Sequence, residues 1–391
     1  MRSLFVWIVA LVLSACGTLS RLPLDADDQA AQRLARSDDL ATEVDAMARP
    51  LVDEGQTPGI LVGILRADGS RQFFQYGVAD KASGAPLGPD TLFAVGSLSK
   101  GFLAEITAGL VQEGALHWDD TLGQLLPAGA RLSADARKIT LQQLATHTSG
   151  LPRQPMTPRM LLYFGEYLLD GHSFYRNLDQ DYILGYLADF RAPGKPEIQY
   201  SNIGYGLLTF IVEHRTGKTV DVLLEEKLKQ PLGLHSTTYE PDQLEGYALR
   251  ARGYAGDQPK FIRRGQPVPD WRFTPAMRGG AALYTTAQDL LTYAAAHLHA
   301  PADPRLAAAL QDSLTPRLSQ GNESAALAWT IEDVGGHQIV YQVGLVAGYS
   351  SYIGLDLKSK VAVVVLQNSF NWTSIGHRLI TRMARAQELR E

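Results

Sequence analysis

The chain has 391 residues, of which 45% are hydrophobic and 20% are charged. This composition is typical of a globular protein with one large domain or two ordinary ones. The net charge is −5, and the Lys and Arg residues are scattered without a long basic block, so we do not expect nucleic acid as a partner.

Residues 1–15 predict a secretory signal peptide. They contain one basic residue, Arg2, followed by an apolar run from Leu4 to Leu13 and then by small residues. A helix needs ~20 apolar residues to cross a bilayer, and this run is too short. An uncleaved anchor helix is the alternative interpretation.

Cys16 is the only cysteine of the chain, so it cannot form an internal disulfide. It follows Leu13-Ser14-Ala15, which resembles a bacterial lipobox. The resemblance implies cleavage before Cys16 and lipidation there, and Gly17 at the next position suggests sorting to the outer membrane. Several acyl chains on one residue would give stable attachment. We therefore expect a periplasmic protein anchored to the membrane by a lipid on Cys16; a chance cysteine after a conventional signal peptide is the alternative.

The elements predicted next are a tether, a strand pair and then helices. Residues 16–40 are expected to form a tether that runs into a first helix. Residues 59–80 predict two strands around a turn at Asp68-Gly69, and apolar residues recur at helical spacing from Leu98 to Leu110. Further helices are expected near residues 139–152, 157–170, 179–188, 203–216, 219–229 and 371–389.

Four short strands with turns between them follow residue 325, and they are expected to be antiparallel because the links are too short for crossovers. Strands therefore lie at both ends of the chain. The prediction is an α/β fold of the α+β type, with one antiparallel sheet flanked by helices. Residues 41–150 and 271–391 would form the α/β part, and residues 151–270 an inserted helical subdomain. A cleft between the two parts is the expected ligand site.

Ser97 and Lys100 form a candidate nucleophile and base. Residues three apart share a helix face, so the hydroxyl and the amine can meet. Serine reacts only after a base removes its proton, and lysine can be that base only when neutral. Burial and the positive end of a helix both lower the pKa of a lysine. The alternative is a helix-capping serine beside a surface lysine.

Tyr200-Ser201-Asn202 is the second candidate element. A tyrosine beside a lysine ionises more readily and could carry the nucleophile's proton to the leaving group. Asn202 offers a donor and an acceptor that could orient Lys100 and a substrate amide. A core tyrosine and a capping asparagine are the alternative. Tyr175-Arg176-Asn177 has the same Y-x-N pattern but lacks the turn, strand and helix around it, so Tyr200 is preferred.

Four segments in this order, FAVGSLSK, LATHTSGLP, YSNIGYGLL and RGGAALYTTAQDL, resemble the beta-lactamase-related serine hydrolases. This family comprises class C beta-lactamases, D-alanyl-D-alanine peptidases and related esterases. The likeness covers residues 45–385 and implies a serine hydrolase domain with the beta-lactamase/DD-peptidase fold. LATHTSGLPRQP leans toward the D-alanyl-D-alanine carboxypeptidase/endopeptidase branch.

The resemblance assigns roles to individual residues. Ser97 would be the acylated nucleophile, Lys100 and Tyr200 the proton-transfer pair, and Asn202 a substrate-orienting group. His147 lies in a loop signature of the family, which gives it a structural role rather than that of a base. No cofactor and no metal are expected.

The family's third motif departs from its usual form. Where relatives carry Lys-Thr-Gly or His-x-Gly on a cleft strand, this chain has Gln342-Val343-Gly344. The strand edge can still bind substrate, because the N–H groups of Ser97 and Leu345 would form the oxyanion hole. Gln342, however, cannot supply the cation that binds a substrate carboxylate. Weak beta-lactamase activity is therefore expected, and Arg278 is a candidate replacement cation.

The leading functional hypothesis is a lipid-anchored periplasmic serine hydrolase that acts on peptidoglycan-type D-Ala peptides or related amides. An esterase of the same fold is one alternative, because esterases of this fold can lack a cation in the third motif. A catalytically weak protein that binds penicillin or muropeptides is another. Peptide, ester and beta-lactam substrates are therefore all expected as partners.

Overall fold

The computed structural model describes residues 24–371 and 373–390. Cys16 and the predicted signal peptide lie outside the described residues. Within the described residues, no helix combines the length and the apolar character needed to cross a bilayer.

One nine-stranded antiparallel sheet forms the α/β half of the molecule, as predicted from the two groups of strands. Its strand order is β3-β2-β1-β11-β10-β9-β8-β7-β6, and Ile60 of β1 pairs with Gln367 of β11. The N-terminal and C-terminal strands therefore meet at the centre of the sheet. The strands are β1 (Gly59–Leu65), β2 (Arg71–Asp80), β3 (Ala85–Pro86), β6 (Leu318–Gln320), β7 (Glu323–Ala325), β8 (Thr330–Val334), β9 (His337–Val346), β10 (Tyr349–Asp356) and β11 (Val361–Gln367).

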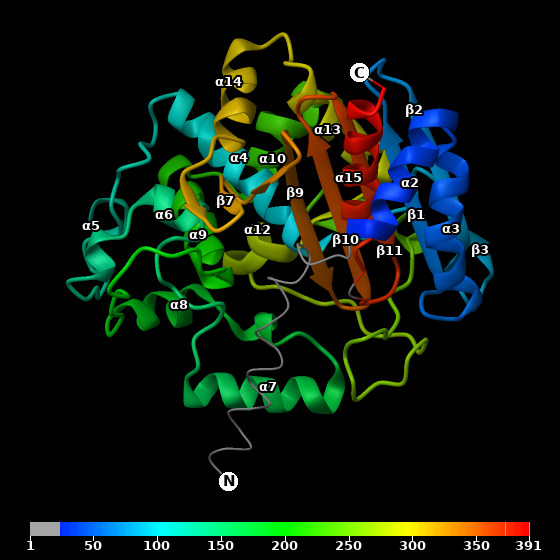
Figure 1. The fold of residues 1–391 in the computed structure, drawn as a ribbon. Coiled ribbons are helices and arrows are strands. Elements are labelled where there is room, and N and C mark those ends of the chain that lie inside the picture. The colour runs from blue at the N-terminus through cyan, green and yellow to red at the C-terminus, as the bar shows by residue number, and fades with distance from the viewer. Residues whose placement is uncertain (1–23, 372, 391) are drawn as a thin grey trace.

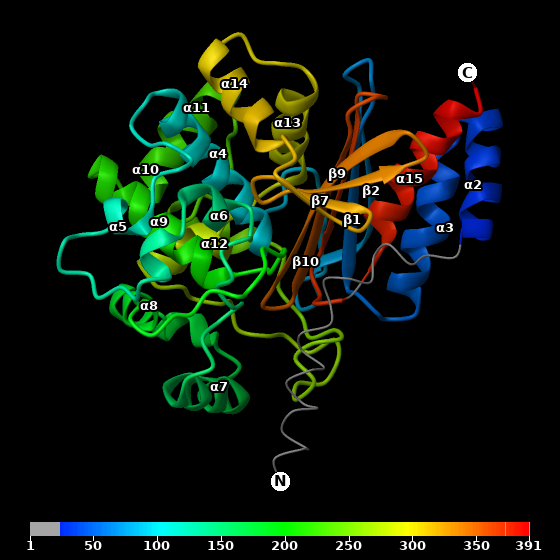
Figure 2. The same ribbon diagram turned by 60° about the vertical axis from the view of Figure 1, so that its left-hand side comes forward.

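Both faces of the central strands are covered. Side chains alternate between the faces of a strand, so in β1 Ile60 and Val62 enter one apolar cluster and Leu61 and Leu65 enter the other. Helices α3 (Leu40–Asp53) and α15 (Ile375–Glu388) cover the outer face, and α2 (Leu24–Ser37) packs on them from outside (Figure 2). The inner face packs against α13 (Ala287–Leu298) and the helical half of the molecule.

The expected tether is partly a packed helix. From Leu24 onward the chain forms α2, which lies along α15 (Figure 1). Arg382 of α15 donates from Nε to Asp27 at 2.7 Å and from Nη1 to Glu43 of α3 at 3.2 Å. The Arg382–Asp27 ion pair therefore attaches α2 to α15, so part of the expected tether of residues 16–40 packs against the domain.

From the sequence, the helical subdomain was expected to begin at residue 151, but helices that precede this residue also pack in the helical half. Helix α6 contacts α9, and Figure 2 shows α5 and α6 among the helices of that half. Helices not yet named are α4 (Ser99–Gln112), α5 (Leu122–Leu125), α6 (Leu141–Ala145), α7 (Pro158–Asp170), α8 (Gln180–Leu187), α9 (Asn202–Thr216), α10 (Val220–Leu224), α11 (Gln230–Leu232), α12 (Arg278–Ala281) and α14 (Pro304–Ser313).

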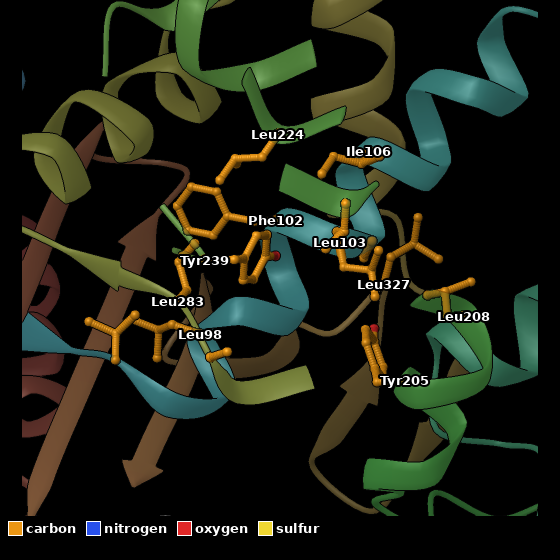
Figure 3. Packing of buried hydrophobic residues seen from close by; sticks show 14 of the residues in the cluster. Leu98, Phe102, Leu103, Ile106, Tyr205, Leu208, Leu224, Tyr239, Leu283 and Leu327 are labelled. Carbon is orange, nitrogen blue, oxygen red and sulfur yellow. The ribbon is translucent and has the colours of Figure 1, made fainter. Parts of the chain in front are cut away.

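Helix α4 lies at the centre of the molecule and is buried on nearly all sides, as expected for a helix that is apolar around most of its surface. Leu98, Phe102, Leu103 and Ile106 pack against residues of α9, α10 and neighbouring loops (Figure 3). Because α4 is held on all sides, the residues of its first turn are fixed in place.

Candidate active site

Ser97 lies in a tight turn that leads into α4. Strand β4 (Phe93–Ala94) pairs with β5 (Tyr284–Thr285), and a 3₁₀ turn, Gly96–Leu98, follows. Gly96 has a φ of +52°, a conformation that favours glycine. The Ser99 hydroxyl donates to Gly96 O at 2.5 Å and accepts from the Leu283 N–H at 3.0 Å. These bonds hold the turn, so the half-buried Ser97 has a defined position.

Lys100 is buried with its amine directed at Ser97. Its Nζ lies 3.1 Å from Ser97 Oγ and donates to Gly280 O at 2.6 Å. A buried amine without such partners would be costly. Gly280 is in α12, which packs closely against α4. This close packing requires the glycine at position 279, because a Cβ added there would lie 2.6 Å from Leu103 Cδ2 of α4. The two glycines of RGGAAL thus bring a carbonyl acceptor to Lys100.

Tyr200 completes the contacts to the nucleophile. Its hydroxyl donates to Ser97 Oγ at 2.5 Å, and Lys100 Nζ lies 4.9 Å from the centroid of its ring. The next residue, Ser201, is the N-cap of α9: its Oγ accepts from Gly204 N–H at 2.9 Å and donates to Pro152 O at 2.8 Å. The start of α9 therefore positions Tyr200.

His147 packs beside Tyr200, with ring centroids 4.3 Å apart, and accepts at Nδ1 from the Ser201 N–H at 3.1 Å. Burial, followed by the charges of Lys100 and Arg153, lowers its pKa well below the ordinary value. His147 is therefore neutral near pH 7, and its Nδ1 lone pair is already engaged. This geometry gives it a role in positioning Tyr200.

Asn202 is buried at the first turn of α9, and its Nδ2 donates to the Tyr175 hydroxyl at 2.5 Å. The sequence had set Tyr175 aside because its Y-x-N pattern lacked the right surroundings. In the structure Tyr175 lies close to the site. It is the hydrogen-bond partner of Asn202, whereas Tyr200 is the tyrosine that contacts Ser97.

The third motif lies on β9, beside the nucleophile turn. A Cβ on Gly96 would lie 2.9 Å from Leu345 N, and one on Gly344 would lie 2.0 Å from Val95 O. The backbones of these segments are thus in contact, so Leu345 lies close to the turn that holds Ser97.

The side chain of Gln342 is buried against α4. A Cβ on Gly101 would lie 2.3 Å from its Nε2, and neither polar atom of the amide has a hydrogen-bond partner among the described residues. β9 therefore presents no cation to the site at position 342.

Arg278, the candidate replacement cation, is engaged elsewhere. Its Nη1 lies 2.8 Å from Asp221 Oδ2 and 2.9 Å from Glu240 Oε1. It lines a cavity of about 220 Å³ to which Ser97, Lys100 and Tyr200 do not contribute. The expectation that Arg278 could replace the missing cation is thus not supported, because two carboxylates already hold its guanidinium.

Two walls flank Ser97. The helical wall consists of Lys100, His147, Arg153 and Tyr200. The strand wall consists of Gln342, Val343, Gly344 and Leu345 of β9. The helical wall can take up and return a proton, and the strand wall supplies backbone donors, so the arrangement suits acyl transfer to a serine.

Three contributors to the site escaped the sequence-based prediction. The Gly280 carbonyl and the Tyr175 hydroxyl reach the site from segments distant in the chain. Arg153 places its guanidinium carbon 4.7 Å from the Tyr200 ring centroid. It directly follows LATHTSGLP, so its proximity to that motif was the one signal available.

Comparisons with known proteins show which family the chain belongs to. The family model described as Beta-lactamase matches residues 44–388. The unguisins hydrolase ungD' of Aspergillus campestris is 27% identical, with 85% of this chain and 62% of the relative covered. Penicillin-binding protein 4 of Amycolatopsis lactamdurans is 30% identical, with 63% and 60% covered. The chain thus spans about three fifths of the length of these curated relatives.

The fold agrees as well. A class C beta-lactamase from Rhodobacter sphaeroides superposes with a TM-score of 0.73 at 22% identity, covering 88% of this chain and 97% of that structure. The family match covers most of the chain and includes all residues of both walls. The chain therefore belongs to the beta-lactamase family.

Proposed function

We propose that this protein is a serine hydrolase that forms an acyl-enzyme on Ser97. Ser97 Oγ attacks the acyl carbon, and its proton passes to the Lys100–Tyr200 pair. The N–H groups of Ser97 and Leu345 stabilise the oxyanion. When the tetrahedral intermediate collapses, the leaving group takes the proton and departs. Water then attacks the acyl-enzyme, with the same pair as base, and releases the acid.

One observation carries this proposal: Ser97 Oγ lies 2.5 Å from the Tyr200 hydroxyl and 3.1 Å from Lys100 Nζ. A general base must be within about 2.6–3.2 Å of the proton it removes. Lys100 and Tyr200 both have polar atoms that close to the nucleophile.

The proposed substrates are peptidoglycan-type D-Ala peptides or related amides. Two observations support this class. A relative at 30% identity is named as a penicillin-binding protein, and the site has an asparagine at the start of α9 that can orient an amide. The uncharged Gln342 supports low activity toward beta-lactams, whose carboxylate would lack a cation on the strand wall.

Intact mass spectrometry tests the proposal. The protein is incubated with a beta-lactam and, separately, with a D-Ala-D-Ala peptide, and we expect an added acyl mass or peptide cleavage. The Ser97→Ala variant should lose both, and the exposed Ser319→Ala variant should keep both. Acylation that persists in Ser97→Ala would contradict the proposal.

An esterase is the second candidate, and the buried, uncharged Gln342 favours it. Ester substrates need no carboxylate, so they do not require a cation on the strand wall. Hydrolysis of p-nitrophenyl acetate without any labelling by a fluorescent penicillin would select this candidate. Labelling or muropeptide binding without turnover would select a binding protein.

We also propose that the protein is a periplasmic lipoprotein attached through Cys16, most consistently to the outer membrane. The lipobox-like Leu13-Ser14-Ala15 before that cysteine supports this assignment. Incorporation of labelled palmitate by the wild type and its loss in Cys16→Ser would be the expected result. Equal labelling of both proteins would contradict it.

A further inference from the structure

The distribution of charge around Ser97 points to a recognition residue outside the family motifs. Gln342 leaves the strand wall without a positive side chain, and its amide is buried against α4 instead of facing the cleft. A substrate carboxylate would therefore find no cation on that side. The positive charge lies on the helical wall.

Arg153 is a cation close to the reacting groups. Its guanidinium carbon lies 4.7 Å from the Tyr200 ring centroid, and the Tyr200 hydroxyl contacts Ser97. The side chain is half-buried, so it is close to the site and still reachable from solvent. Its charge affects the pKa of two neighbours. The pKa of His147 is lowered by burial first, then by the charge of Lys100 and then by that of Arg153. The pKa of Tyr175 is raised by burial, and the charge of Arg153 reduces that rise.

The backbone at Arg153 is attached to the substrate-orienting segment. The Arg153 carbonyl accepts from the Asn202 N–H at 3.0 Å, and the preceding carbonyl, that of Pro152, accepts from the Ser201 hydroxyl. Arg153 is therefore placed beside Asn202, which the family resemblance expects to orient the acyl part of a substrate. A group bound by Arg153 would then lie close to that acyl part.

We propose that Arg153 is a specificity-determining residue that binds a carboxylate in the acyl part of the substrate, on the side of Ser97 opposite β9. This inference rests on the proposed function, since it needs an acyl group on Ser97. Arginine suits the task because its planar guanidinium can form two parallel hydrogen bonds to a carboxylate. The preferred substrates are thus acyl donors with an acidic acyl group.

A matched pair of esters tests the proposal. Mono-p-nitrophenyl glutarate and p-nitrophenyl valerate have acyl chains of equal length, but only the glutarate carries a carboxylate. The readout is the ratio of their kcat/KM values, each corrected for hydrolysis in buffer alone. We expect the wild type to prefer the glutarate, and Arg153→Gln to lower the ratio about 10- to 100-fold. Arg153→Lys should lie between them.

Arg159→Gln is the matched control. Arg159 is an exposed arginine over another tyrosine ring, with its guanidinium carbon 6.0 Å from the Tyr163 centroid, and its removal should leave the ratio unchanged. A wild type without preference for the glutarate would overturn the proposal, and that measurement needs no variant. Equal losses on both esters in Arg153→Gln would also overturn it, because they would mean that Arg153 acts through Tyr200.

Failure of the proposed function would look different. In that case the wild type would hydrolyse neither ester, or Ser97→Ala would hydrolyse both as fast as the wild type does. Failure of the Arg153 proposal alone would leave hydrolysis dependent on Ser97 while the two esters react without charge preference.

Discussion

The helical wall contacts Ser97 directly, and the strand wall lies against the turn that holds it, but the two walls differ in how they act. The helical wall works through ionisable side chains that reach Ser97 from α4 and from the start of α9. The strand wall works through backbone, since Gln342 is buried and Gly344 has no side chain. Chemistry and recognition therefore have separate requirements here: two side chains close to Ser97 could transfer a proton, whereas position 342 carries no cation.

The difference suggests that the strand wall tolerates a change of side chain as long as its backbone stays in place. An oxyanion hole needs N–H groups at a fixed position, and these are independent of side-chain charge. The proton-transfer pair has no such freedom, because it depends on two particular side chains. Substitutions on the two walls should therefore have unequal effects.

The largest effect is expected for Lys100→Met on the helical wall. Met fills a similar volume but cannot exchange a proton with Ser97, and positioned acid–base catalysis contributes about 10²–10⁴-fold. We expect kcat/KM for p-nitrophenyl acetate to fall by about that factor, while circular dichroism stays unchanged. The exposed Lys138→Met is the control. A loss below tenfold in Lys100→Met would mean that Tyr200 alone serves as base.

Gly96→Ala tests the backbone of the strand wall. The new Cβ would lie 2.9 Å from Leu345 N at a φ of +52°, so the turn or β9 must move. Displacing one oxyanion donor costs about 10²–10³ in rate, and we expect kcat to fall by about that much.

Gly114→Ala is the matched control for Gly96→Ala. Gly114 also has a positive φ, +72°, but a Cβ there meets nothing within 4 Å. It should lower the free energy of unfolding by about 1 kcal/mol and leave kcat unchanged. If the two variants lost activity equally, close contact with Leu345 would not be the cause.

Gln342→Lys restores a cation to the strand wall. If that wall lacks only charge, the variant should be acylated by a fluorescent penicillin about tenfold faster than the wild type, as a charge-assisted bond to the carboxylate would allow. Gln338→Lys, at an exposed position of the same strand, controls for added charge. Unchanged labelling in Gln342→Lys would show that a lysine at this position, where the side chain of Gln342 is buried against α4, does not supply that bond.

The smallest effect is expected in the pH dependence of the free energy of unfolding, to which His147 contributes. Its folded pKa lies well below the unfolded value of about 6.5, so the unfolded chain binds more protons between these two values. Stability should thus fall as the pH decreases below about 6.5, by up to about 1.4 kcal/mol per pH unit from this group. Denaturant unfolding at pH 7 and pH 5 should show a smaller decrease in His147→Gln than in the wild type. The exposed His235→Gln should match the wild type, and an equal decrease in His147→Gln would contradict the assignment.

The sheet could be predicted well from sequence because its strands are local apolar runs with turn signals between them. Four short strands were expected after residue 325, and one of the strands found there is β9, His337–Val346. Helices α13 and α14 were missed even though each has a local start signal. Thr286 caps α13 by accepting from the Asp289 N–H, and Asp303 caps α14 ahead of Pro304.

The site was predictable only where its contacts are local or carry a motif. Ser97 and Lys100 are three residues apart on one helical turn, so their contact follows from helix geometry. The Gly280 carbonyl is 180 residues from Lys100, and its approach depends on how α12 packs. Only its proximity to the LATHTSGLP motif linked Arg153 to the site, because its contact with the Tyr200 ring follows from the path of a loop.

The pairing of Ile60 with Gln367 at the centre of the sheet has a consequence for biosynthesis. During translation, β1 is made early but its partner emerges roughly 300 residues later, and closing so long a loop is entropically unfavourable and slow. A product that stops before Val361 would lack β11 and α15, so β1 would be left at an open edge of the sheet. Such edges template association with other chains, so C-terminal truncation should give insoluble material rather than a smaller functional enzyme.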